Sequence, residues 1–153
     1  MQNAALERSA LTTHEKTIAG GLNFAAIFFP YVAPVLALLA VRDSTFVRFH
    51  AFRALIEQVV RTVIIGILVI ASLSYSIYSM VQAGVFADGV DLSKIDWVTL
   101  LIKSALTWLA LALWGVLNTI SSVIDGLQAL QGNMPKKLKW ADRLAARWSG
   151  ATL

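Results

Sequence analysis

Few side chains in this 153-residue sequence have the types and spacing that could do chemistry. The chain has no cysteine, which excludes disulfides, thiolate metal sites, iron–sulfur clusters and a cysteine nucleophile. Its two histidines, His14 and His50, stand on opposite sides of a long apolar run. The Walker, GxGxxG, HExxH and GxSxG patterns are all missing. We therefore expect no catalytic residues, no metal site and no enzyme.

Three titratable residues remain as candidates for an active role. His50 could ligate haem or a pigment, or sense pH, but a histidine satisfied at the membrane interface is the favoured interpretation because no second ligand accompanies it. Lys103 follows Trp97 by six residues, so its ammonium can reach the headgroups, and a proton-relay role is the alternative. Asp125 ends an apolar run, where solvation suffices to explain it. Any bound cofactor stays unknown, with His50 as its weak candidate, and an intramembrane enzyme is the least favoured hypothesis.

The composition is that of an integral membrane protein. Hydrophobic residues make up 58% of the chain, charged residues only 14%, and the mean hydropathy is +0.69. A soluble domain carries about a quarter charged residues. This excludes a soluble enzyme, a disordered tail and a nucleic-acid binder, despite the net charge of +4.

Charge-free runs predict an all-α bundle with three transmembrane helices. The spans cover about residues 17–41, 62–87 and 97–124, and each exceeds the roughly 20 residues that a bilayer core requires. A polar segment at 1–16, which lacks the features of a signal peptide, precedes this membrane domain of residues 17–132. A basic tail at 133–153 follows it.

Residues 45–61 have the pattern of an amphipathic helix at the membrane interface. Apolar residues recur every three to four positions, and charged residues fall on or near the other face. Ser44 or Thr45 can cap its start, and Glu57 stands four residues from both Arg53 and Arg61. We expect this helix to run into the second span. Its lipid- or partner-facing residues are Arg48, Phe49, His50 and Arg53.

The basic tail predicts a second amphipathic helix. Trp140, Leu144 and Trp148 follow at four-residue spacing, surrounded by lysines and arginines, which is typical of a helix on an anionic membrane surface. Packing on a partner protein is the alternative. The residues expected at this surface are Lys137, Trp140, Arg143 and Trp148.

The distribution of lysine and arginine predicts the orientation. With three spans, nine such residues fall on the side of the 45–61 segment and the tail, against three on the other side. The positive-inside rule then places the N-terminus outside and the C-terminus in the cytoplasm of a bacterial inner membrane.

Small residues and prolines indicate how the spans pack. Two stripes of matching period predict that the second and third spans touch face to face, and Pro30 and Pro34 predict a kink in the first span. The stripe residues are Ser72, Ser76 and Ser79 in the second span, and Gly115, Thr119 and Ser122 in the third.

The string TFVRFHAFRAL resembles the FVRFHAxQAL signature of a group of small bacterial membrane proteins of unknown function. That group is similar to the chloroplast inner-envelope import component of the Tic-twenty type. Arg53 replaces the expected glutamine, and the basic MPKKLKW replaces the expected aromatic-proline ending. The resemblance implies a small helical membrane protein and a role in translocation or assembly.

Two functions follow from these patterns. The favoured one is a non-catalytic accessory or assembly subunit of a larger membrane protein complex, because nothing assembles a nucleophile, a base and an oxyanion site. Its partners are anionic membrane lipids and that complex, and not nucleic acid. The alternative is a component of a translocation or channel assembly.

Overall fold

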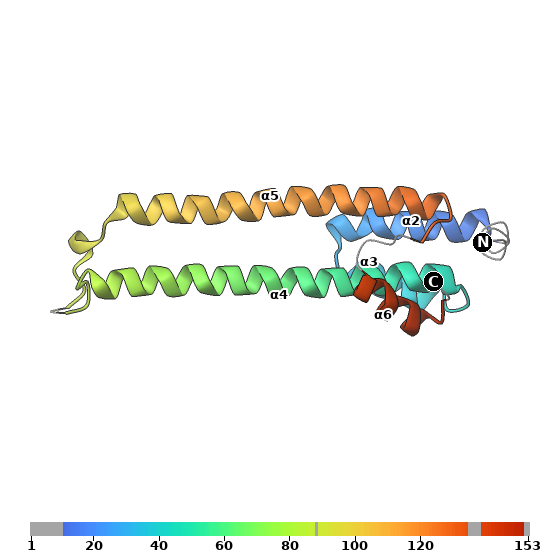
Figure 1. Ribbon diagram of the computed structural model, residues 1–153, viewed down its shortest axis with the longest axis horizontal. Helices are drawn as coiled ribbons and strands as arrows, with labels where there is room; N and C mark the ends of the chain where they lie inside the picture. Colours follow the sequence, from blue (N-terminus) through green and yellow to red (C-terminus); the bar gives the residue numbers. More distant parts are fainter. Residues whose placement is uncertain (1–10, 88, 135–138, 152–153) are drawn as a thin grey trace. The chain divides into compact units, whose positions relative to one another are not determined.

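The computed structural model describes residues 11–87, 89–134 and 139–151, and within them every regular element is a helix. The helices are α2 (Thr13–Phe28), α3 (Val32–Ala40), α4 (Thr45–Gln82), α5 (Trp97–Leu130) and α6 (Lys139–Ser149), with a 3₁₀ turn η1 at Leu92–Lys94 (Figure 1). This confirms the all-α class. The chain forms two compact units: a terminal unit of residues 1–60 and 117–153, and a central unit of residues 61–116.

Two helices of the described residues, not three, are long and apolar enough to cross a membrane. They are α4, with 38 residues, and α5, with 34 residues. At about 1.5 Å per residue, either one exceeds the roughly 30 Å hydrocarbon core of a bilayer. The predicted third span lies within α5, which begins at Trp97 as expected, with Asp96 Oδ1 accepting from the Thr99 N–H at 3.0 Å. The predicted second span at 62–87 extends past the end of α4, which stops at Gln82 and is followed by turn residues.

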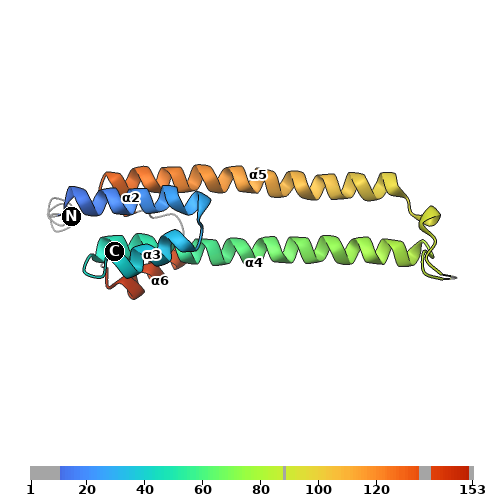
Figure 2. The same ribbon diagram turned by 180° about the vertical axis from the view of Figure 1, so that it is seen from behind.

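The predicted first span at 17–41 is wrong. The segment forms α2 and α3, of 16 and nine residues, and α3 folds back along α2 (Figures 1 and 2). The helices are about 24 and 14 Å long, too short to cross. Pro30 follows the last turn of α2, where its ring cannot continue the helix, so it ends the helix instead of kinking it. Pro34 lies buried in the first turn of α3, where a proline is tolerated.

The predicted interfacial helix at 45–61 is the first part of α4 and forms the centre of the terminal unit. Ser44 caps it by accepting the Val47 N–H at 3.3 Å, as expected. A helix on a membrane surface would leave one face exposed, but this segment is buried on several faces. Its buried residues are Phe46, Val47, Phe49, His50, Ala51, Arg53, Ala54, Ile56 and Gln58.

Glycine allows α2 and α5 to approach closely within the terminal unit. A Cβ added at Gly126 would lie 2.9 Å from Phe24 Cζ, and one at Gly20 would lie 3.2 Å from the Gly126 carbonyl oxygen. Gly126 therefore makes a close helix contact within α5. The helix ends four residues later at Leu130, where Gly132 (φ +77°) adopts the left-handed conformation of a C-terminal cap.

The tail helix α6 packs on the first part of α4. Ala141, Ala145 and Ala146 form a buried cluster with Phe49 and Ile56 of α4. Small side chains on this face let the two helices approach. The tail therefore covers a surface of its own chain, an arrangement that neither sequence-based alternative included.

Candidate functional site

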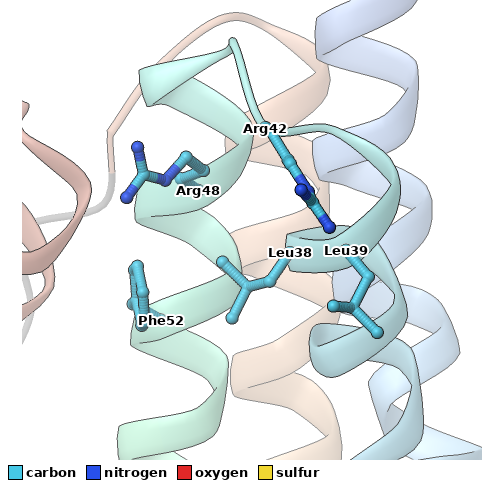
Figure 3. Close-up of a pocket in the computed structure, with 5 residues that line it drawn as sticks. All are labelled: Leu38, Leu39, Arg42, Arg48 and Phe52. Carbon is cyan, nitrogen blue, oxygen red and sulfur yellow. The ribbon is translucent and has the colours of Figure 1, made fainter.

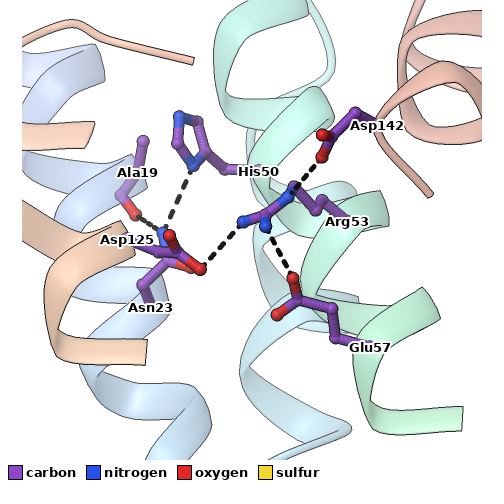
Figure 4. A network of polar contacts seen from close by, with 7 residues as sticks. All are labelled: Ala19, Asn23, His50, Arg53, Glu57, Asp125 and Asp142. Atoms are coloured by element: carbon purple, nitrogen blue, oxygen red, sulfur yellow. Dashed lines mark hydrogen bonds and ion pairs between the residues drawn. The ribbon is translucent and has the colours of Figure 1, made fainter. Parts of the chain in front are cut away.

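Arg53 of α4 binds three carboxylates from three helices (Figure 4). Its Nε donates to Asp142 Oδ1 of α6 at 2.7 Å, and its Nη1 donates to Asp125 Oδ2 of α5 at 2.9 Å. Its Nη2 lies 2.7 Å from Glu57 Oε1, one turn further along α4, which confirms the predicted 53–57 pair. We call these four residues the Arg53 cluster.

The Arg53 cluster is buried, and this decides what it can do. The Arg53 side chain is 2% exposed, Asp125 1% and Asp142 5%, while Glu57 keeps 20%. A planar guanidinium with five donors is suited to bind several carboxylates at once. Each of its three nitrogens faces a different carboxylate, so the cluster ties α4, α5 and α6 together.

The environments of Arg53 and Asp125 thus differ from those that the sequence predicted. Arg53 was expected at lipid phosphates and Asp125 in solvent, yet both lie inside the terminal unit. Among the described residues, no group of three histidine, aspartate or glutamate side chains is arranged to hold a metal ion.

His50 lies beside this cluster in the packed interior and not at a membrane interface (Figure 4). Asn23 Nδ2 lies 3.3 Å from His50 Nδ1 and also donates to the Ala19 carbonyl oxygen at 2.8 Å. Because an amide nitrogen can only donate, His50 Nδ1 accepts this bond. The Phe46 and Phe49 rings meet the imidazole edge-on, with centroids 4.7 and 5.6 Å away. The imidazole is therefore a packed core group.

The turn between α2 and α3 is fixed to α4 by hydrogen bonds that the sequence did not indicate. Tyr31 Oη donates to the Gln58 carbonyl oxygen at 3.1 Å, and Gln58 Nε2 donates to the Ala26 carbonyl oxygen at 3.5 Å. The only signal in the sequence was the amide side chain of Gln58, which follows Glu57 directly.

Of the remaining residues predicted to face lipid or a partner, one is buried and several are at least partly exposed. Phe49 is fully buried against α6. Trp140 and Trp148 are about half exposed, Arg143 is exposed, and Arg48 Nη2 donates to the Trp148 carbonyl oxygen at 3.3 Å. Lys137 lies outside the described residues.

The predicted packing residues lie on the expected helices. Ser72, Ser76 and Ser79 are half-buried on α4, and Ser76 Oγ donates to the Ser72 carbonyl oxygen of its own helix at 3.0 Å. The third-span set, Gly115, Thr119 and Ser122, lies on α5. That these stripes face one another stays a prediction.

Within the central unit, Lys103 Nζ donates to the Tyr75 hydroxyl and lies 4.4 Å from the centroid of its ring. The sequence indicated snorkelling but not this aromatic partner.

The loop between the two candidate spans is built by short-range contacts. Asp91 Oδ1 accepts from the Ser93 N–H at 3.0 Å, and Val85 and Ile95 are buried beneath the loop. Hydrogen bonds from Ser93 lower the pKa of Asp91, and hydrogen bonds from Thr99 lower the pKa of Asp96. Both carboxylates are thus held in their charged form.

Large apolar side chains are exposed along the candidate spans of α4 and α5. They include Ile67, Ile70, Leu73, Leu101, Leu106 and Trp108. A soluble protein rarely exposes so large an apolar surface to water. The fold is that of a small all-helical membrane protein with two candidate spans and a buried ionic cluster.

Comparison with known families agrees with this class and makes it specific. The model of the magnetosome magnetite crystal formation protein family, MamF/MmsF, matches residues 14–143, and the chain belongs to this family. No curated protein and no solved structure matches the chain. The comparisons give no support to the similarity with the chloroplast import component.

Proposed function

We propose that this chain is a non-catalytic accessory protein of the magnetosome membrane that supports magnetite crystal formation within a larger membrane protein complex. Membership of the magnetite crystal formation family supports a role in crystal formation. The two apolar helices support a location in the membrane.

The accessory role is supported above all by one observation: the guanidinium group of Arg53 is fully engaged by carboxylates of its own chain. All three guanidinium nitrogens face carboxylates of the same chain, and the side chains are buried. Such a cluster offers a substrate no open position and instead fixes helices from distant parts of the sequence. We infer that the terminal unit is a rigid platform that other subunits recognise.

We further propose that both termini lie on the cytoplasmic face. The earlier expectation of an external N-terminus required a crossing at 17–41, and α2 and α3 are too short to provide one. Two crossings leave eleven lysines and arginines in residues 1–61 and 125–153, against Lys94 and Lys103 elsewhere. The positive-inside rule assigns the richer side to the cytoplasm and the loop of residues 83–96 to the opposite face.

Deletion and complementation test the proposed function. In a magnetosome-forming host that lacks this gene, electron microscopy is expected to show smaller or misshapen magnetite crystals inside normally formed vesicles, restored by the wild-type chain. Native gels in mild detergent are expected to show the chain in a species much larger than 16.6 kDa. Unchanged crystals in the deletion strain, or migration as a lone monomer, would contradict the proposal.

A translocation or channel role rests on the FVRFHAxQAL resemblance alone. It stays a prediction, and the features of the terminal unit favour the accessory role.

A further inference from the structure

A groove opens between α3 and the first part of α4 in the terminal unit (Figure 3). It has a volume of about 360 Å³ and is lined by Leu38, Leu39, Arg42, Arg48 and Phe52. Pockets that bind small ligands begin at about 300 Å³. The groove can therefore hold a headgroup and part of one acyl chain, but not a whole lipid.

The lining changes from cationic to apolar in the same direction on both walls. The walls are antiparallel helices joined by the short turn at 41–44, so both lead away from that turn (Figure 3). Leu38 lies four residues before Arg42, which follows the end of α3, and Phe52 lies one helical turn beyond Arg48 in α4. The two arginines thus line the end of the groove at the 41–44 turn, and the apolar side chains line the part of the groove further from that turn.

The charge at the mouth is positive. Arg42 is exposed, and Arg48 Nη2 donates to the Trp148 carbonyl oxygen, one bond from a guanidinium group that carries five N–H donors. Asp43 is exposed in the same turn but does not line the groove. Two arginines without a lining carboxylate are complementary to a phosphate group, which guanidinium binds through paired hydrogen bonds.

The surface beside the groove is apolar. The α3 side chains Val32, Val35, Leu36 and Leu39 are all exposed, although the helix contains no polar residue. Such a surface is stable only against lipid or another apolar partner. The occupant of the groove must therefore be compatible with an apolar surround and carry an anionic head.

We propose that this groove binds one anionic phospholipid, with its phosphate between Arg42 and Arg48 and an acyl chain along Leu38, Leu39 and Phe52. The inference rests on the membrane location given under the proposed function. It adds a specific lipid site to the terminal unit.

Photolabelling of the full-length chain tests this site. The protein is reconstituted in phosphatidylcholine vesicles that contain a small fraction of phosphatidylglycerol with a photoactivatable acyl chain, and labelled peptides are identified by mass spectrometry. We expect labelling within residues 38–52, competed by unlabelled phosphatidylglycerol and not by phosphatidylcholine or inorganic phosphate. Equal competition by phosphatidylcholine, or full competition by inorganic phosphate, would overturn the proposal.

Matched variants separate the groove from general surface charge. The R42Q/R48Q double variant is expected to weaken phosphatidylglycerol competition roughly thirtyfold, from about 1 kcal/mol for each arginine near an anionic lipid. The R143Q/R147Q variant removes the same charge from α6, outside the groove, and is expected to compete like the wild type. Equal loss in both variants would overturn the specific site.

If R42Q/R48Q loses the lipid but still restores crystals in the deletion strain, the lipid site stands and the accessory role does not depend on it. Normal crystals in the deletion strain would instead remove the proposed function while leaving the lipid result intact.

Discussion

Arg53 and Asp142 are joined by a 2.7 Å ion pair that fixes the tail helix α6 to the first part of α4, although 89 residues separate them in the sequence. The pair is almost completely buried. It lies directly beside the small-residue contact of Ala141, Ala145 and Ala146 with α4. The ionic and the apolar contacts therefore hold the same helix in the same place.

Replacing Asp142 with asparagine should loosen α6 without unfolding the terminal unit, because Arg53 keeps Asp125 and Glu57. A hydrogen bond to a charged group contributes about 1.5–3 kcal/mol. Amide hydrogen exchange in α6 should accelerate tenfold or more, while exchange in α2 stays unchanged. The exposed Asp43→Asn variant is the control. Unaltered α6 exchange in Asp142→Asn would show that the pair does not hold the helix.

Replacing Arg53 with methionine should destabilise the whole terminal unit. The change leaves three carboxylates facing one another without a cation, and removal of one partner of a buried ion pair typically costs about 3–5 kcal/mol. Thermal unfolding in detergent should show a clear drop in Tm. The exposed Arg147→Met variant should change stability by less than about 0.5 kcal/mol. Similar Tm values for the two variants would contradict the assigned role of the cluster.

Gly126→Ala and Gly115→Ala should have opposite effects. At Gly126 the new methyl would lie 2.9 Å from the Phe24 ring, so the change should cost about 1–3 kcal/mol. At Gly115 no described atom lies within 4 Å of the new methyl, and alanine is the better helix former by about 1 kcal/mol. Denaturant titrations would compare the two. A clear loss of stability in Gly115→Ala would instead support the predicted contact between the small-residue stripes.

The start of α2 should weaken in acid. A hydrogen bond from Ser44, followed by one from the Thr12 backbone, lowers the pKa of Glu15 below its ordinary value of 4.5. The charged carboxylate therefore stabilises the fold above pH 4.5, and this contribution is lost as the pH falls through the lowered pKa. Glu15→Gln should accelerate amide exchange in the first turn of α2 at pH 6, and the difference from the wild type should shrink as the pH falls below 4.5. A difference that stays constant on acidification until the fold is lost would exclude this cap as its source.

The sequence predicted the local features of the fold well and its tertiary contacts poorly. The Ser44 cap, the start of α5 and the 53–57 ion pair depend on residues within one helical turn, and the structure confirms each. Hydropathy gave the first span incorrectly because an apolar run does not distinguish one helix from two that fold back on each other.

The Arg53 cluster was missed for a related reason. In a helix considered alone, Arg53 falls on the polar face, and its placement at a surface follows from that pattern. The carboxylates that bury it come from residues 125 and 142, and no periodicity in the sequence links those positions to residue 53. Only the packing of α5 and α6 on α4 brings them together.

The most direct test of the account is the number of membrane crossings. The chain has no cysteine, so single cysteines at His14, Val90 and Arg147 can be labelled without background by a maleimide that does not cross membranes. All three residues are exposed. In inner-membrane vesicles of known orientation, the account predicts that His14→Cys and Arg147→Cys are labelled from the cytoplasmic face and Val90→Cys from the opposite face. Labelling of His14→Cys and Val90→Cys from the same face would contradict it and restore a third crossing between residues 17 and 41.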